Sequence, residues 1–258
     1  AGIQTAALAF GGDSGSPPPA TRDQAVTESY NGSSWTEVND LNASRRRISG
    51  NGTTTSALAA GGFEPPGVAK VESWNGSNWT EVGDLNQARS SAGQAGADNT
   101  SSIVFGGSNP AGALLALTET WNGSAWTEVN DLNTSGYGVT GVGIVTAALA
   151  SDRANASDVA QTVVESWNGS SWTEVANLNT PRYYAGGSCS GTNTAALYFG
   201  GQAPGGVTAV NESWNGSSWT EIVDLSIARA GAGGSGIQSS ALAFGGAPPY
   251  MNSTEEFT

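Results

Sequence analysis

The 258-residue sequence contains no histidine and a single cysteine, Cys189. Without histidine, the chain has no Ser-His-Asp or Cys-His catalytic arrangement, no imidazole metal ligand and no ordinary titration near neutral pH. One cysteine excludes an internal disulfide, and the Gly-rich segment GGSCSG favours a small packed residue over a reactive thiol. Most common enzyme mechanisms are therefore excluded, and we predict no catalytic residue.

Charged residues are also scarce: 12% of the chain, about half of the roughly 25% that is usual. Nine basic residues, one of them a lysine, against 22 acidic residues give a formal net charge of −13. This charge disfavours nucleic acid and anionic lipid as partners. No apolar run approaches the ~18 residues that cross a bilayer, and no signal-like segment is present, so we predict no membrane insertion. The chain begins at Ala1 without Met, which is expected of a processed or excerpted sequence.

Repetition is the main feature that the sequence does have. A Glu-x-aromatic-Asn-Gly-Ser-x-Trp-Thr-Glu pattern occurs five times and begins a sixth time, with spacings of 44, 47, 46, 47 and 43 residues. A period near 45 is typical of folds in which each copy buries its faces against its neighbours. Because the repeat is uninterrupted, we predict a single domain over residues 1–258. The copies open at Glu28, Glu72, Glu119, Glu165, Glu212 and Glu255.

Each copy predicts four β-strands. Residues 5–12 (TAALAFGG) alternate larger and smaller apolar side chains, as a strand buried on both faces does. Residues 71–82 (VESWNGSNWTEV) place two short strands around Asn-Gly, a strong hairpin signal because both turn positions of a type I′ turn need φ > 0. Asp-Leu-Asn then leads to an Arg and a Gly-rich strand, as at residues 229–236.

The double glycine, the aromatic and the Trp about five residues later, followed by Leu and Arg, resemble the kelch motif of β-propellers. The resemblance covers nearly the whole chain. It implies an all-β propeller of four-stranded antiparallel blades in which Gly11, Gly12, Tyr30, Trp35 and their equivalents are structural. The fourth copy departs from the motif, with Ala150-Ser151-Asp152 in place of the glycines and Ser135-Gly136 near the Arg position, so we expect a distorted blade there.

Two of the four strands occur six times in the sequence and the other two occur five times. The first copy lacks its Gly-rich strand and the last its Trp strand, which predicts six blades with two incomplete ones. Five blades remain an alternative if residues 229–236 complete the first blade. Because GIQTAALAFGG near one end resembles GIQSSALAFGG near the other, we expect the ends to lie in adjacent blades of one ring. We also expect strand pairing between residues 4–12 and 229–257, within one chain or between adjacent chains, and we favour closure within the chain.

The loops between the second and third strands vary in length and sequence, and variable loops on a rigid scaffold commonly carry recognition. They should emerge on the same face as the connections from the fourth strand to the next blade. The alternative is that Pro and Gly merely tolerate length differences. The apolar residues in these loops are our candidates for a protein contact: Leu114, Leu115, Pro249, Tyr250 and Met251.

The Asn-Gly-Ser turns lie on the opposite face of the predicted propeller. Turn chemistry explains each of them, although Asn-x-Ser is also an N-glycosylation acceptor. A third interpretation is a ring of shallow sugar sites in which Trp faces stack on pyranose rings. The periodic spacing of the Trp instead favours their burial between blades. The asparagines of these turns, which are the alternative sugar-facing residues, are Asn31, Asn75, Asn122, Asn168 and Asn215.

The carboxylates recur with the same period as the Trp. A catalytic pair needs two carboxylates in unlike environments, so repetition in every copy favours solvated or Arg-paired strand residues. No sialidase-type Ser-x-Asp-x-Gly-x-x-Trp box occurs, and a galactose-oxidase-like copper site would need histidine. The loop aspartates show no calcium-ligand spacing, so we predict no metal and no cofactor.

The sequence therefore predicts a non-enzymatic structural or binding propeller that displays variable loops for protein contact. The sequence around the Asn-Gly-Ser turns also resembles kelch-like repeats of tailed-phage and environmental bacterial surface proteins. This resemblance implies that the chain belongs to an extracellular or virion assembly, where it would be a fibre or decoration protein. Expected partners are structural proteins of that assembly or a surface receptor or glycan, and a homo-oligomer is compatible with the sequence. A carbohydrate-binding, lectin-like propeller is the alternative, and a glycoside hydrolase is the third class.

Overall fold

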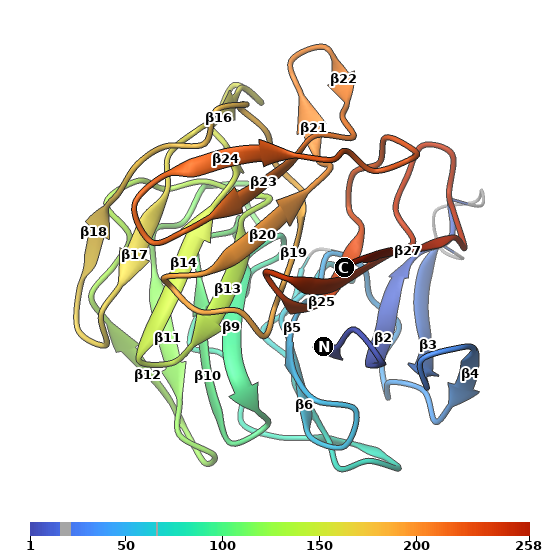
Figure 1. The fold of residues 1–258 in the computed structure, drawn as a ribbon. Helices are drawn as coiled ribbons and strands as arrows, with labels where there is room; N and C mark the ends of the chain where they lie inside the picture. The colour runs from blue at the N-terminus through green and yellow to red at the C-terminus, as the bar shows by residue number, and fades with distance from the viewer. Residues whose placement is uncertain (16–21, 66) are drawn as a thin grey trace.

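The chain forms six antiparallel β-sheets arranged as the blades of a propeller in a computed structural model that describes residues 1–15, 22–65 and 67–258 (Figure 1). The all-β fold and the six blades confirm the prediction, and the five-bladed alternative is wrong. Five blades have four strands, and blade 6 has three. Within the described ranges, no helix is long and apolar enough to cross a membrane.

The blades follow one another along the chain, and each is a continuous stretch of sequence. Blade 1 contains β1 (Gly2–Ile3), β2 (Ala6–Asp13), β3 (Asp23–Tyr30) and β4 (Trp35–Val38). Blade 2 contains β5 (Ser49–Gly52), β6 (Ala57–Ala60), β7 (Val71–Trp74) and β8 (Trp79–Glu81). Blade 3 contains β9 (Gly93–Asp98), β10 (Ser101–Phe105), β11 (Thr118–Trp121) and β12 (Trp126–Val129).

Two of the remaining blades carry an extra hairpin between their second and third strands. Blade 4 contains β13 (Thr140–Ile144), β14 (Ala147–Ser151), β17 (Glu165–Trp167) and β18 (Trp172–Glu174), with the hairpin β15 (Arg153–Ala154) and β16 (Ala160–Gln161). Blade 5 contains β19 (Gly186–Gly187), β20 (Ala196–Phe199), β23 (Asn211–Trp214) and β24 (Trp219–Ile222), with the hairpin β21 (Gln202–Ala203) and β22 (Gly206–Val207). Blade 6 contains β25 (Gly233–Ile237), β26 (Ser240–Phe244) and β27 (Thr254–Phe257).

The first blade is complete, contrary to the strand count from the sequence. The two-residue strand β1 pairs with β2 through Gly2↔Ala7 and Ile3↔Ala6 and takes the place of the Gly-rich strand. β1 is two residues long, too short to show the Gly-rich pattern that identifies this strand in the other copies. Only blade 6 lacks a strand among the described residues, and the missing strand is the outer one.

The Asn-Gly hairpins are four-residue loops rather than the two-residue type I′ turns that the sequence suggested. In blade 3, Trp121 pairs with Trp126, so that four residues connect the strands. Gly123 has φ +92°, whereas Asn122 is not among the residues with positive φ. The Asn122 Oδ1 instead accepts hydrogen bonds from Ser124 N at 3.0 Å and Ala125 N at 3.0 Å. The asparagine closes the loop with its side chain, an alternative that a dipeptide signal does not distinguish.

Apolar clusters fill the interfaces between neighbouring blades. The interface between blades 3 and 4 is an example, with Phe105, Leu132 and Trp172 buried and the rings of Phe105 and Trp172 4.8 Å apart. Leu132 comes from the loop that leaves blade 3, and Trp172 from the outer strand of blade 4. The predicted burial of the Trp is confirmed for eight of the nine, whereas Trp35 in blade 1 is only half-buried.

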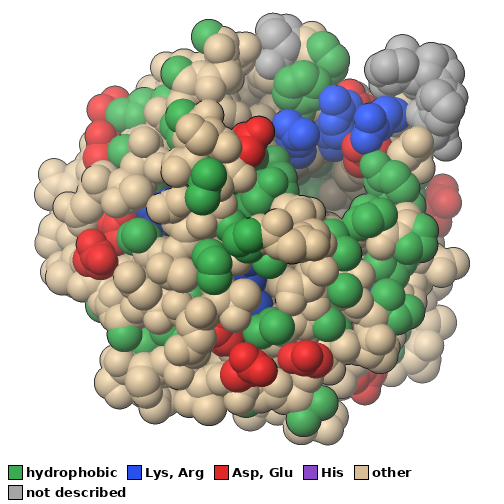
Figure 2. Space-filling model, turned by 90° about the horizontal axis from the view of Figure 1, so that it is seen from above, with side chains coloured by type: hydrophobic (Ala, Val, Ile, Leu, Met, Phe, Trp, Pro, Cys, Tyr) green, Lys and Arg blue, Asp and Glu red, His purple; other side chains and the backbone are tan. Residues whose placement is uncertain are grey.

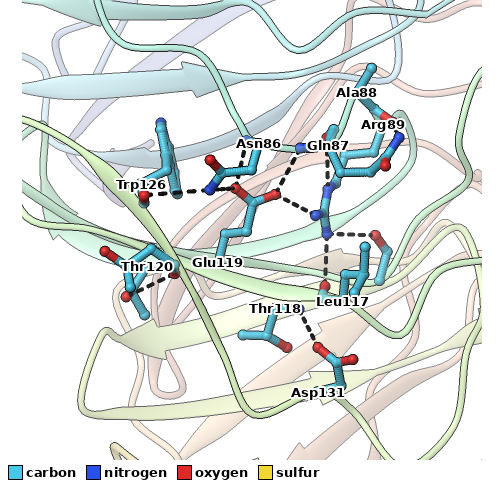
Figure 3. Close-up of polar contacts among 12 residues, drawn as sticks. Asn86, Gln87, Ala88, Arg89, Leu117, Thr118, Glu119, Thr120, Trp126 and Asp131 are labelled. Carbon is cyan, nitrogen blue, oxygen red and sulfur yellow. Dashed lines mark hydrogen bonds and ion pairs between the residues drawn. The ribbon is translucent and has the colours of Figure 1, made fainter.

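Buried arginine–glutamate pairs lie beside these clusters, and Figure 3 shows the one between blades 2 and 3. Arg89 Nη2 donates to Glu119 Oε1 at 2.5 Å, and its Nη1 donates to Leu117 O at 2.7 Å. Glu119 Oε2 accepts from both the backbone and the side chain of Asn86, at 2.7 and 2.8 Å. Removing one member of such a fully bonded buried pair costs about 3–5 kcal/mol. The pairing recurs as Arg45–Glu72, Arg182–Glu212 and Arg229–Glu255.

Blade 4 also has a buried arginine–glutamate pair, but its arginine comes from another position. Arg153 stands where other copies have a glycine, and Gly136 stands where they have the arginine. Its sheet is a regular four-stranded one, so the expected distortion is wrong. Asp152 has φ +53°, a left-handed conformation that glycine supplies in other copies and that Asp tolerates. Arg153 follows it and donates to Glu165 Oε1 at 2.9 Å. A side chain at Gly136 would start 2.9 Å from the Arg153 Cβ, so the arginine fills the space that the loop leaves empty.

The ring closes within the chain, and blade 6 packs against blade 1. The two similar end segments do lie in adjacent blades, as expected, but no strand pairing joins them among the described residues. Side chains make the closure: Gln4 Nε2 donates to Phe257 O at 2.9 Å, and the Trp35 and Phe244 rings lie 4.9 Å apart. Pairing of the two ends within one chain is therefore absent from the described residues, where β1 completes blade 1 instead. Pairing between adjacent chains, the alternative, stays a prediction.

Candidate interaction site: the loop face and the channel mouth

The variable loops and the connections between blades share one face, as predicted. An isolated backbone bridge joins a residue of the connection that leaves each of the first five blades to a residue near the second-to-third loop of the next blade. At the centre of this face a cavity of about 1280 Å³ opens, and its lining includes residues from every blade. Figure 2 looks down on this face and shows the hollow, with Lys and Arg side chains gathered at one edge. We call this surface the loop face.

A ring of backbone hydrogen bonds surrounds the mouth of the cavity. The residue two positions before the first strand of each of blades 2–6 has φ between 54° and 68°; these residues are Arg47, Ser91, Gly138, Tyr184 and Gly231. Ser91 N donates to Arg47 O at 3.1 Å, and Gly138 N donates to Ser91 O at 2.8 Å. Tyr184 N donates to Gly138 O at 2.9 Å, and Gly231 N donates to Tyr184 O at 2.8 Å. We call these five residues the collar; it is open between its last member, in blade 6, and its first, in blade 2.

Cations concentrate beside the collar. Five of the nine basic residues belong to the buried arginine–glutamate pairs; of the other four, Arg46 and Arg47 line the cavity. Arg22 lies nearby and bonds Asp13 Oδ2 at 2.5 Å and the Tyr250 hydroxyl at 3.0 Å. Partial burial raises the pKa of Asp13, but the hydrogen bond and charge of Arg22 outweigh this effect and hold the pKa below its usual value. Exposed Arg47 has no carboxylate partner among the described residues, so it is a cation available to a ligand.

The predicted protein-contact residues divide into two groups. Tyr250, half exposed, and Met251 line the cavity, with exposed Pro249 beside them. Leu114 and Leu115 lie half-buried in the loop of blade 3, away from the cavity lining. The structure therefore places Tyr250 and Met251 at the mouth of the cavity, and Leu114 and Leu115 elsewhere on the loop face. Their role in contact stays a prediction.

The five asparagines considered as sugar-facing residues are all exposed, at the turns of the opposite face. Each Asn Oδ1 is already an acceptor for backbone amides of its own turn, for example Asn31 Oδ1 for Ser33 N and Ser34 N at 3.0 Å. Eight of the nine Trp of these hairpins are buried in the blade interfaces; Trp35 is half-buried. This arrangement supports the turn interpretation of the Asn-Gly-Ser segments.

Other candidate groups are tied to structural roles. Asp13 and Asp23 pair with arginines, and Asp158 accepts a hydrogen bond from the Tyr137 hydroxyl at 2.7 Å. The described residues contain no group of three or more side chains suited to a metal ion. Cys189 lines the cavity with its Sγ 3.2 Å from Gly234 O, and burial raises the pKa of its thiol.

The sequence did not reveal the collar or the cationic edge. The only signal was the fixed spacing of the collar residue, two positions after Arg45, Arg89, Arg182 and Arg229, where the residue type varies freely. Because the collar is formed by backbone groups in a left-handed conformation, side-chain identity does not mark it. No family model matches the chain, and no curated protein matches it either.

Proposed function

We propose that this chain is a non-enzymatic binding propeller whose loop face holds a protein partner. A propeller fold is compatible with a protein-binding role. One observation carries the proposal: the six loops of the loop face differ in length and sequence, whereas the turns of the opposite face are nearly identical. Variation confined to one face of a rigid ring is the pattern of a recognition surface.

The kelch-like motif and the Ser/Thr/Asn-rich, acidic surface support a place in an extracellular or virion assembly, as a fibre or decoration protein. The partner is then another structural protein of the assembly or a surface receptor. Tyr250, Met251 and Arg47, which has no carboxylate partner among the described residues, all line the cavity and offer apolar and cationic groups to a partner. Aromatic and arginine side chains commonly dominate binding energy.

Site-specific photo-crosslinking tests this proposal. A photoreactive side chain at Tyr250 should capture a protein from the particle or secreted fraction that contains this chain, whereas the same side chain at Asn122 on the opposite face should not. The purified partner should then bind Y250A at least about tenfold more weakly than the parent, and N122A unchanged. Capture only from Asn122 would contradict the proposal. Saturable binding on a glycan array that turn-face variants abolish would instead establish the lectin alternative.

A further inference from the structure

Three tyrosines form a cluster on the loop face between blades 4 and 5. Tyr137 lies in the connection that enters blade 4, and Tyr183 and Tyr184 lie in the connection that enters blade 5. The Tyr137 ring centre is 5.6 Å from that of Tyr183 and 5.8 Å from that of Tyr184, and the latter two are 5.2 Å apart. All three residues are half-buried, so the cluster keeps part of its aromatic surface open to solvent. We call these residues the tyrosine cluster.

A glycine makes room for this cluster. Gly138 has φ +68°, and a Cβ at this position would lie 3.1 Å from Tyr183 Cδ2 and 3.3 Å from Tyr184 Cδ1. The Tyr184 hydroxyl lies 2.9 Å from Ser91 Oγ, which fixes the far end of that ring. The rings are therefore held in place by contacts within the chain.

The tyrosine cluster lies at the bases of the two extra hairpins. Tyr137 N donates to Ala154 O at 3.3 Å and Ala154 N donates to Tyr137 O at 2.9 Å, which joins the cluster to β15. Tyr183 and Gln202 exchange the same two bonds at 3.1 and 2.7 Å, which joins it to β21. Figure 1 shows β16, β21 and β22 at the top of the view. Within the described ranges only blades 4 and 5 carry such a hairpin, so no other blade offers this setting.

A carboxylate is fixed beside the cluster. Asp158 lies in the turn between β15 and β16, and its Oδ1 accepts a hydrogen bond from the Tyr137 hydroxyl at 2.7 Å. Asp158 N donates to Asn155 O at 3.0 Å, and Asn155 Oδ1 accepts from Val159 N at 3.1 Å, so the turn is closed by its own bonds. Asp158 is exposed, and no Arg or Lys side chain pairs with it among the described residues.

The charge and the rings of this surface favour a cation. The chain has a net charge of −13, and cations are attracted to the faces of aromatic rings. Burial, and then the hydrogen bond to Asp158, raise the pKa of Tyr137, so that its hydroxyl stays a proton donor to the carboxylate. Asp158 Oδ2 remains available as an acceptor for a cationic donor from outside the chain.

Arginine fits this surface better than lysine does. A guanidinium group is planar, so it stacks on an aromatic ring and donates to a carboxylate at the same time. An ammonium group is a compact, strongly hydrated charge without a flat face. Val159, which is 50% exposed beside Asp158, offers an apolar surface to the aliphatic part of an arginine side chain.

We propose that the tyrosine cluster and Asp158 form a docking site for an exposed arginine of the protein partner. This inference rests on the proposed function, because it names the chemistry of the partner and the part of the loop face that receives it. The guanidinium group lies against the tyrosine cluster and donates to Asp158 Oδ2, while the Tyr137 hydroxyl continues to donate to Oδ1. The hairpins β15–β16 and β21–β22 flank the site.

A titration with N-acetyl-arginine amide tests the site without the partner, read by the amide chemical shifts of the whole chain in NMR spectra. N-acetyl-citrulline amide is the matched control, because it has nearly the same shape and no charge. We expect saturable shifts at residues 137, 158 and 183 with the arginine amide. The citrulline amide should bind at least about tenfold more weakly, because hydrogen bonds to a charged group are the stronger ones.

Variants of the chain separate the two parts of the site. D158N removes the charge, keeps the shape and should weaken binding of the arginine amide about threefold, whereas the exposed control D84N should bind as the parent does. Y183L removes an aromatic ring and should also weaken binding. Y183F keeps the ring and should restore the affinity of the parent, which separates stacking from any role of the hydroxyl.

Three results of the titration would overturn this proposal: no saturable shift, equal affinity for the citrulline amide, or unchanged affinity in D158N. A dimer of the chain that R47Q dissociates would also overturn it, since Arg47 of a second copy would then be the occupant. The partner captured through Tyr250 distinguishes this inference from the proposed function. Equal binding of that partner to D158N and the parent would contradict the docking site alone, whereas capture only from Asn122 would contradict the proposed function.

Discussion

At the residue scale, the same side-chain types were predictable where they repeat and unpredictable where their partner lies in another blade. The regular spacing of the nine Trp predicts that they are buried, and eight of them are. The glutamates have the same period, yet Glu119 is buried against Arg89 while Glu28 is exposed. The difference depends on whether a connecting loop arrives from the preceding blade, which no local pattern around Glu28 encodes.

Truncation of a buried Trp should be severely destabilising. Trp126 and Trp172 are 8 and 6% exposed, and their indole N–H groups bond Gly83 O at 2.9 Å and Thr118 Oγ1 at 3.1 Å. We expect W126A and W172A to lower the free energy of unfolding by about 3–5 kcal/mol in urea titrations, and W126F and W172F to cost less. If the Ala variants unfold like the parent while binding a partner less well, these residues are recognition residues and the burial assignment is wrong.

Asp152 should make stability fall as the pH rises through the acid range. Burial raises the pKa of this carboxyl from 3.8 to about 6, although Arg182 Nε, 3.7 Å away, opposes the shift. The folded state therefore binds the proton more tightly than the unfolded state, and between about pH 4 and pH 6 this group costs up to roughly 3 kcal/mol. The full loss of stability is present above pH 6, and no loss is present below the ordinary pKa of 3.8 that Asp152 has in the unfolded chain.

Replacing Asp152 by Asn should remove that slope. Asn is neutral, nearly isosteric and tolerates the left-handed φ at this position, and Arg182 keeps its bond to Glu212 at 2.7 Å. The free energy of unfolding of D152N minus that of the parent should rise between pH 4 and pH 6, and D152N should remain the more stable protein at pH 7. The exposed D84N serves as the control. A difference between D152N and parent that does not change with pH would contradict the assignment.

At the scale of elements, the repeating strands and their order could be read from the sequence, but strand β1, the extra hairpins of blades 4 and 5 and the form of the turns could not. Alternation and the Asn-Gly signals placed the second, third and outer strands correctly. The same Asn-Gly signal led to the wrong turn, because Asn122 uses its side chain rather than a positive φ to close the loop. The strand β1 was missed because a strand of two residues is too short to carry a pattern.

The side-chain closure of the turns predicts different effects for two substitutions of Asn122. N122A removes the acceptor of two backbone amides, and we expect a loss of about 0.5–2 kcal/mol, as for side chains that cap helices. N122D keeps the acceptor oxygen and should cost much less. Thermal unfolding of the two variants, compared with S124A, measures the difference. Equal stability of N122A and the parent would show that the asparagine oxygen contributes nothing to the turn and would reopen its reading as a sugar contact.

At the scale of the whole molecule, the sequence predicted a closed ring and the adjacency of its ends, while the means of closure came only from the structure. A ring can close by sharing a strand or by packing one blade against another. The sequence similarity of the ends indicates adjacency and does not distinguish these cases. The cavity is lined by all six blades and the collar joins five of them, so both lie beyond what one repeat can reveal.

Deleting residues 254–258 should test how much the last strand contributes to the ring. The deletion removes β27, and with it the Glu255 partner of Arg229, the Phe257 ring stacked 5.5 Å from Phe199, and the Thr254 oxygen that accepts the Trp35 indole N–H at 3.0 Å. Arg229, whose side chain is fully buried, would be left without a carboxylate, which alone costs about 3–5 kcal/mol. The newly exposed edge of β26 also invites intermolecular pairing.

Calorimetry and light scattering should therefore show a lower, broader unfolding transition and increased aggregation for the deletion. The control E256Q changes the charge of β27 without removing the strand, and it should unfold within about 1 kcal/mol of the parent because surface substitutions rarely cost more. An unchanged transition with the deletion still monomeric would contradict closure through β27. Dissociation of an oligomer upon deletion, with the monomer equally stable, would show that this strand pairs between chains, and that the ring of one chain does not depend on it.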